Sequence, residues 1–177
     1  MNQSVPQQSW YAAKVFHNRL NEAEQILNGA GYESYIAMQK VAVEKAQGSL
    51  KSVKRPLIRS LIFFRCTVDD ITKISQLLQG KAMIYLKPGE MRQAAPIPDD
   101  QMNIFRLVTS IDDKLEYLGD STEAYNVGQQ VLVTGGPFEG AIGRIFRIKG
   151  DKRLVVSISG VCAVATSYIP SCFLKKL

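Results

Sequence analysis

The chain has 177 residues, 46% of them hydrophobic, and a formal net charge of +6 at pH 7. No apolar run approaches the roughly 20 residues that a membrane-spanning helix needs, and residues 1–6 lack the basic and apolar segments of a signal peptide. Three unevenly spaced cysteines give no disulfide framework, so a protein of the reducing cytoplasm is expected.

The charge is divided unevenly along the chain. Residues 1–110 carry a net +5, residues 111–123 a net −4 and residues 124–177 a net +5. This division predicts two basic domains, 1–110 and 124–177, joined by an acidic, solvated linker. Basic domains favour polyanionic surroundings such as nucleic acid or a nucleoprotein machine.

The first domain alternates strand and helix patterns. Asn18 is predicted to cap the first helix, which Gly31 ends, and the strand that starts at Leu57 is apolar enough for the centre of a sheet. The predicted elements are strand 10–16, a helix from 18, a strand or hairpin arm 32–45, a basic flexible loop 47–56, strand 57–66, a helix from 69, strand 82–86 and a helix from 98. This order predicts an α+β sandwich with one mainly antiparallel sheet.

The second domain reads as a small β-barrel. Val131 and Val133 alternate with polar neighbours as in a half-buried strand, and Gly135-Gly136-Pro137 then supplies a turn. Further β-branched runs follow, separated by short polar turns. Five short strands in about fifty residues fit a small barrel that Phe138 would close at one end.

Residues 127–145 resemble a KOW motif, the SH3-like barrel of NusG-type transcription elongation factors and several ribosomal proteins. The first domain, which opens with Ser9-Trp10-Tyr11, resembles the NusG N-terminal domain, so the resemblance runs from residue 10 to residue 177. NusG and its paralogue RfaH usually carry a Phe-Pro-Gly-Tyr-like segment where this chain has Ile58-Arg59-Ser60-Leu61. This departure resembles the specialised UpxY antiterminators of capsular polysaccharide operons.

The resemblance implies a partner for the first domain. Family members bind the clamp helices of the largest RNA polymerase subunit through an apolar depression, and specialised members also touch the non-template DNA strand. By position, the depression would involve Tyr11, Leu61, Phe63 and Ile84. Ordinary core packing explains each of these four residues equally well.

Nucleic-acid contacts are implied at two places. The loop after the first strand offers His17, Asn18 and Arg19, with helix capping or plain solvation as the alternative for each. A second group of cations, Lys51, Lys54 and Arg55, would lie near nucleic acid or the polymerase. The nucleic acid would be non-template DNA or nascent RNA.

The barrel implies its own partner. In NusG it contacts the termination factor Rho or a small-subunit ribosomal protein, and Phe138 and Ile158 are the candidate contacts here. Ser159 and Val161 replace the aromatic and basic residues that Rho uses, so weak Rho binding is expected. We expect a monomer that is not bound to a membrane.

Catalysis is not expected. One histidine cannot form a His-pair metal site, and the chain has no Cys-x-x-Cys, phosphate loop or nucleophile elbow, so no metal or cofactor is predicted. The function expected is antitermination by a polymerase-bound factor. A general NusG that assists termination and a ribosome-associated KOW protein that binds RNA remain as alternatives.

Overall fold

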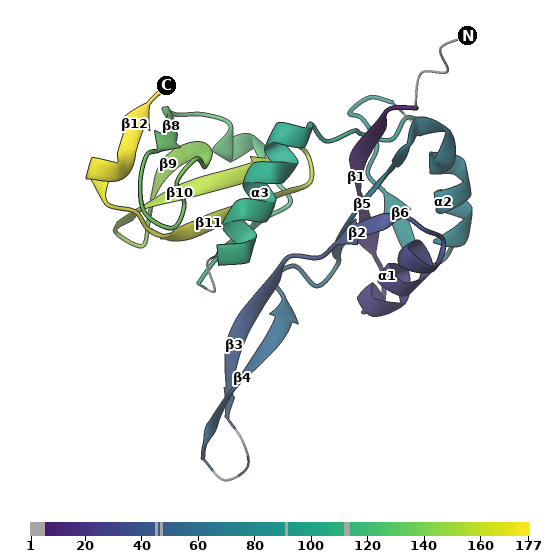
Figure 1. Cartoon of the computed structure of the whole chain (residues 1–177), viewed down its shortest axis with the longest axis horizontal. Coiled ribbons are helices and arrows are strands. Elements are labelled where there is room, and N and C mark those ends of the chain that lie inside the picture. The colour runs from purple at the N-terminus through teal and green to yellow at the C-terminus, as the bar shows by residue number, and fades with distance from the viewer. Residues whose placement is uncertain (1–5, 45, 47, 91, 112–113) are drawn as a thin grey trace. The chain divides into compact units, whose positions relative to one another are not determined.

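A computed structural model describes residues 6–44, 46, 48–90, 92–111 and 114–177 (Figure 1). The chain divides into two compact units. The N-terminal unit contains the described residues up to Ile36 together with Arg59–Asp99, and the C-terminal unit contains Ala37–Ile58 and Asp100–Leu177. This division differs from the predicted one over residues 37–58 and 100–110, and the predicted boundaries at 110 and 123 stay predictions.

The N-terminal unit is built on a four-stranded sheet with the order β2-β5-β1-β6, in which every neighbouring pair is antiparallel. Its strands and helices are β1 Gln8–Val15, α1 Leu20–Gly29, β2 Glu33–Tyr35, β5 Leu61–Thr67, η1 Val68–Asp70, α2 Ile71–Leu77 and β6 Ala82–Ile84. The apolar run predicted for the centre of the sheet is β5, although it begins at Leu61 rather than Leu57.

The sheet has two apolar faces because side chains alternate along β1 and β5. One face packs against α1 and α2 in a core of Tyr11, Ala13, Val15, Leu20, Ala23, Leu27, Ile62, Phe64, Cys66, Ile74, Leu78 and Ile84. The opposite face carries Trp10 and Ala12 from β1 and Leu61 and Phe63 from β5. Trp10 also accepts a backbone hydrogen bond from Ile97 at 2.8 Å, which ties residue 97 to β1.

The C-terminal unit holds a two-stranded sheet, a helix and a six-stranded sheet. Its elements are β3 Met38–Glu44, β4 Leu50–Pro56, α3 Asp99–Ile111, β7 Glu116–Gly119, η2 Glu123–Tyr125, β8 Gln130–Val133, β9 Ile142–Ile148, β10 Asp151–Ile158, β11 Cys162–Tyr168, η3 Ser171–Phe173 and β12 Leu174–Lys176. The first residue of α3, Asp99, belongs to the N-terminal unit. The larger sheet has the order β12-β8-β9-β10-β11-β7 and is antiparallel throughout. The predicted α+β class is therefore confirmed.

Two segments differ from their predicted form. Residues 116–119, predicted within a solvated linker, form β7, which pairs with β11 at the edge of the six-stranded sheet. Residues 50–56, predicted within a flexible loop, form β4, because Val41 and Val53 face each other across a regular hairpin with β3. Both predictions gave too much weight to charge, which an exposed strand face tolerates.

Glycine at position 143 is required by a close backbone contact. A Cβ atom there would lie 2.6 Å from the Val155 carbonyl oxygen, on the neighbouring strand β10. The carbonyl is fixed by the β9–β10 ladder, so neither group can move away cheaply. The role of this glycine in strand packing depends on a contact that the sequence does not reveal.

Candidate functional site

The structure separates the four residues predicted to line the apolar depression. Tyr11 and Ile84 belong to the core beneath α1 and α2, where the Tyr11 ring stacks on Phe64 with centroids 6.0 Å apart. Leu61 and Phe63 lie on the opposite face of the sheet. All four residues are buried, with exposed fractions from 1% for Phe63 to 7% for Ile84. Tyr11 and Ile84 are thus core residues, and burial raises the pKa of Tyr11.

The face that carries Leu61 and Phe63 continues into exposed positions. Phe63 lies opposite Ala12 on β1 and Tyr35 on β2, with the Tyr35 and Phe63 rings 6.4 Å apart. Lys14 lies opposite both Leu61 and Met83, and Met83 is 58% exposed. The pairing register of β1 with β5 and β6 places Lys14 and Met83, and not Tyr11 and Ile84, on the face of Phe63. Lys14 and Met83 are therefore exposed positions on this sheet face.

The turn between β1 and α1 presents three exposed polar residues. His17 and Asn18 have φ angles of 53° and 57°, in the left-handed region that few non-glycine residues adopt. Arg19 occupies the N-cap position of α1, so the prediction that Asn18 caps this helix is wrong. The Arg19 Nε atom lies 3.9 Å from the Glu22 carboxylate, which also lies 3.8 Å from Lys81 Nζ. The structure thus brings His17, Asn18 and Arg19 together in one small exposed turn.

The second predicted group of cations lies on the β3–β4 hairpin. Lys51, Lys54 and Arg55 are all exposed on β4. Lys40 of β3, which the sequence did not single out, lies directly opposite Lys54. Only the register of the β3–β4 pair shows that Lys40 is a neighbour of Lys54. The cations therefore belong to a paired β-ribbon with defined faces.

The two residues predicted for the partner surface of the second domain are buried. Phe138 is 6% exposed and Ile158, which pairs with Cys162, is 1% exposed. Val161, aligned with a basic contact residue of NusG, is also buried, whereas Ser159 is exposed. Phe138 and Ile158 are therefore packing residues of the C-terminal domain. A partner would have to contact exposed side chains of the domain, such as Tyr168.

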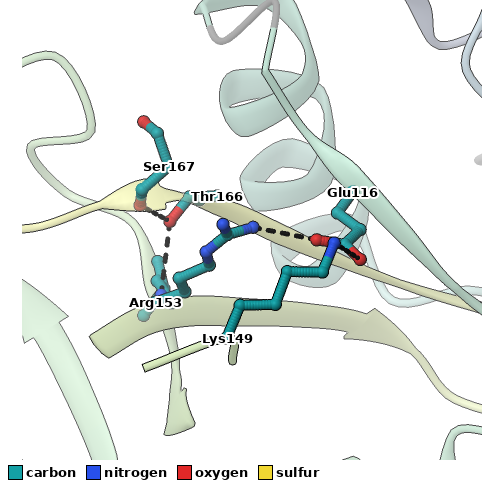
Figure 2. A network of polar contacts seen from close by, with 6 residues as sticks. Glu116, Lys149, Arg153, Thr166 and Ser167 are labelled. Carbon is teal, nitrogen blue, oxygen red and sulfur yellow. Dashed lines mark hydrogen bonds and ion pairs between the residues drawn. The ribbon is translucent and has the colours of Figure 1, made fainter. Parts of the chain in front are cut away.

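A charged network joins β7 to the β9–β10 turn (Figure 2). Lys149 Nζ donates to Glu116 Oε1 at 2.9 Å, and Arg153 Nη1 donates to Glu116 Oε2 at 3.0 Å. The Lys149 hydrogen bond is the main reason why the pKa of Glu116 lies below its usual value, with Arg153 adding to it and burial opposing it. Nearby, Thr166 Oγ1 accepts from the Leu154 amide at 3.2 Å and donates to the Ser167 carbonyl at 2.7 Å. These contacts are structural and fix the sheet edge.

Among the residues that the structure describes, no three His, Cys, Asp or Glu side chains are grouped to hold a metal ion. Burial raises the pKa values of Cys66 and Cys162 to about 12, so both thiols stay protonated at neutral pH. Within the same described part of the chain, no helix is long and apolar enough to cross a bilayer.

Comparison with known proteins assigns the family. The family model described as "NusG: Transcription termination factor nusG" matches residues 8–106, more than half of the chain. The chain belongs to the NusG family. A similar solved structure, titled "Domain interaction in Thermotoga maritima NusG", shares 15% identity with a TM-score of 0.47, covering 97% of this chain and 98% of that one. No curated protein matches the chain.

The NusG match includes most of the candidate site. It covers the sheet face of Phe63 and Met83, the turn at residues 17–19 and the β3–β4 hairpin. The six-stranded sheet lies beyond it. The family assignment thus rests on the region that carries the exposed cations and the apolar sheet face.

Proposed function

We propose that this NusG-family chain is a specialised elongation factor of the cytoplasm. It binds RNA polymerase as a monomer and promotes readthrough in selected operons, with polysaccharide biosynthesis operons as the favoured targets. The observation that carries the proposal is the NusG match over residues 8–106, the region that contains the apolar sheet face. The specialised role is supported by Ile58-Arg59-Ser60-Leu61, which stands where general members carry a Phe-Pro-Gly-Tyr-like segment.

The polymerase contact is proposed for the sheet face of Leu61, Phe63, Lys14 and Met83. Leu61 and Phe63 are packed under the surface and give the face its shape, while Met83 and Lys14 are exposed and reach a partner directly. An amphipathic helix pair such as the polymerase clamp helices suits this combination, because an apolar anchor supplies buried area and a charged rim sets the register.

Such a factor needs no bond-making step. It acts by binding the closed, elongating polymerase more tightly than the paused or opened form. The gain in readthrough is limited by that difference in affinity, since a ligand with equal affinity for both states shifts neither. Tight binding alone would therefore not make the protein an antiterminator.

Selection of operons is proposed for the turn of His17, Asn18 and Arg19. The left-handed backbone at His17 and Asn18 turns three exposed polar side chains outward in succession. Arginine can bind a phosphate or a guanine edge, asparagine can read adenine, and histidine can stack on an unpaired base. Exposed non-template DNA at the polymerase surface offers all three kinds of group.

The C-terminal sheet is proposed to be a KOW-type domain with weak affinity for Rho. Ser159 is exposed at the position where Rho binding requires an aromatic ring. Val161 is buried, so the position of the basic contact residue presents no side chain to Rho. A buried aromatic anchor contributes of the order of a hundredfold in affinity, which serine cannot replace. A small-subunit ribosomal protein remains the other proposed partner of this domain.

The test has two parts. Core RNA polymerase from the source cell should co-purify with the tagged protein, and terminator readthrough should rise more on a template with the target operon's leader than on one without it. Stimulation of Rho-dependent termination at concentrations typical of a general NusG would favour the termination alternative. Co-purification with ribosomal subunits in place of polymerase would favour the ribosome-associated alternative.

A further inference from the structure

Strands β3 and β4 form a ribbon of their own. In the described part of the chain they pair with each other over seven residues and with no other strand. A backbone hydrogen bond from the Leu57 amide to the Ala37 carbonyl at 2.8 Å closes the base of the ribbon (Figure 1). The register of the pair decides which side chains share a face, because successive residues of a strand point to opposite sides.

One face of the ribbon, here called the valine face, has an apolar centre. It consists of Gln39, Val41, Val43, Lys51, Val53 and Arg55. Val41 lies opposite Val53 at its middle, and the three valines are half-buried. Lys51 and Arg55 are exposed and lie on either side of Val53 along β4. The paired residues bring no carboxylate to this face, so every charge that they place around the valines is positive.

The opposite face of the ribbon has a different charge pattern. It carries Glu44 together with Lys40 and Lys54, so charges of both signs share it. An apolar centre with a charged rim of one sign is typical of a surface that contacts another protein, because the centre supplies buried area and the rim selects a partner of opposite charge. The valine face therefore fits an apolar patch that is edged by carboxylates.

The dimensions of the valine face limit what it can bind. Lys51 and Arg55 are four residues apart on one strand, or about 13 Å, and carboxylates two turns apart on a helix, about 11 Å, are within reach of both side chains. The ribbon is about 23 Å long and two strands, about 10 Å, wide. The resulting area of about 230 Å² is far below the roughly 800 Å² that each partner buries in a stable interface. The valine face can therefore only add to a larger contact with the same partner.

We propose that the valine face of the β3–β4 ribbon is a second contact surface for RNA polymerase, where it receives an apolar patch edged by carboxylates. This inference rests on the polymerase binding proposed above, which supplies the larger contact. Nucleic acid fits the face less well. Residues 38–56 contain no aromatic side chain on which a base could stack, and a phosphate backbone would place hydrated charges against the valines that separate Lys51 from Arg55.

The first test measures the affinity of the full chain for the source organism's core RNA polymerase without nucleic acid. Val41→Thr with Val53→Thr keeps the shape and strand preference of the pair, so the melting temperature should change little. Affinity should fall about tenfold, because two hydroxyl groups would be buried against an apolar patch. Val68→Thr is the control, since Val68 is 70% exposed on η1, and it should change affinity less than about twofold.

The second test changes the charge of the rim. Lys51→Glu with Arg55→Glu should weaken polymerase binding at least tenfold at about 0.1 M salt, and the loss should shrink as the salt concentration is raised. The matched control, Lys175→Glu with Lys176→Glu, reverses two exposed lysines of β12 and should change affinity less than about threefold.

Three results would overturn the ribbon contact alone, with the wild type still bound to polymerase. The first is unchanged affinity in both ribbon variants. The second is an equal loss in the β12 control, because general charge would then explain binding. The third is a loss in the Lys51 and Arg55 variant only when the polymerase carries a DNA scaffold, which would assign these cations to nucleic acid. A wild-type chain that does not bind core polymerase would overturn the proposed function and the ribbon contact together.

Discussion

The Glu116 carboxylate accepts a hydrogen bond from Arg153 at 3.0 Å across 37 residues of chain, and this contact joins the first strand of the six-stranded sheet to its centre. Glu116 lies in a segment whose charge predicts a linker. Its partners Arg153 and Lys149 are brought close only when β9 and β10 form a hairpin. The ion pairs thus explain why acidic residues are found at the edge of a folded sheet.

Glu116→Gln should lower the free energy of unfolding by about 1–2 kcal/mol, because Arg153 is only 17% exposed and would lose its charged acceptor. Denaturant unfolding measures this change. Glu139→Gln, at an exposed position, is the control and should be close to neutral. An equal effect of the two substitutions would show that the network contributes nothing specific.

The contribution of Glu116 to the free energy of unfolding should depend on pH. The pKa of Glu116 is lowered in the folded chain from its usual 4.5, so its contribution to stability is complete above 4.5 and is lost as the pH falls through the folded value. The stability difference between the wild type and Glu116→Gln should therefore shrink on acidification below pH 4.5. A difference that stays constant down to pH 3 would contradict the ion-pair account.

A second acid-sensitive group, Asp70, lies in the N-terminal unit. Thr67 Oγ1 donates to its carboxylate at 2.8 Å, and this hydrogen bond is the main reason why the pKa of Asp70 is lowered from 3.8. Thr67→Val should raise the pKa of Asp70, as NMR titration would measure, whereas Thr67→Ser keeps the hydroxyl and should leave it low. A raised pKa in the serine variant too would point to a different cause.

Gly143→Ala should destabilise the C-terminal sheet by about 2–3 kcal/mol, because the new methyl group meets the Val155 carbonyl at 2.6 Å. Gly29→Ala is the matched control, since Gly29 ends α1 and a Cβ atom there meets nothing within 4 Å. Alanine is a better helix former, so this control should be neutral or slightly stabilising. Similar melting temperatures for the two variants would rule out the steric account.

The sequence predicted the helices well and the faces of the strands poorly. The strongly patterned helices α1 and α3 and the apolar strand β5 were found because each buries one continuous stripe or run. The candidate residues Tyr11 and Phe63 were placed in one depression, but they lie on opposite faces of the sheet. Strand register decides such placements, and it depends on pairing with distant segments.

The β3–β4 hairpin is a second case in which the sequence did not reveal which residues share a strand face. Its cations suggested a loop, since a ribbon without a covering layer has a weak apolar signal. The Lys40–Lys54 pair became visible only when the two strands were aligned. The basic character of this segment could therefore be predicted from composition. Which of its cations share a face could not be predicted without the strand register.

The proposed polymerase contact uses the exposed part of the apolar sheet face. Met83→Asp should weaken polymerase affinity at least tenfold without unfolding the chain, because Met83 is 58% exposed and a desolvated, unpaired carboxylate in an interface is costly. Leu61→Asp and Phe63→Asp should unfold the sheet instead, since both residues are buried. Val68→Asp, at an exposed apolar residue of η1, is the control and should bind normally. Equal affinities for the Met83 and Val68 variants would exclude this face.

The most direct test of the proposed function is single-round transcription by the source organism's core RNA polymerase on a template that carries the target operon's leader and a downstream terminator. Adding the purified protein should raise the fraction of transcripts that pass the terminator, and deletion of the leader should remove most of that gain. An unchanged or lowered readthrough fraction on the leader template, at protein concentrations that saturate the polymerase, would contradict the antiterminator account.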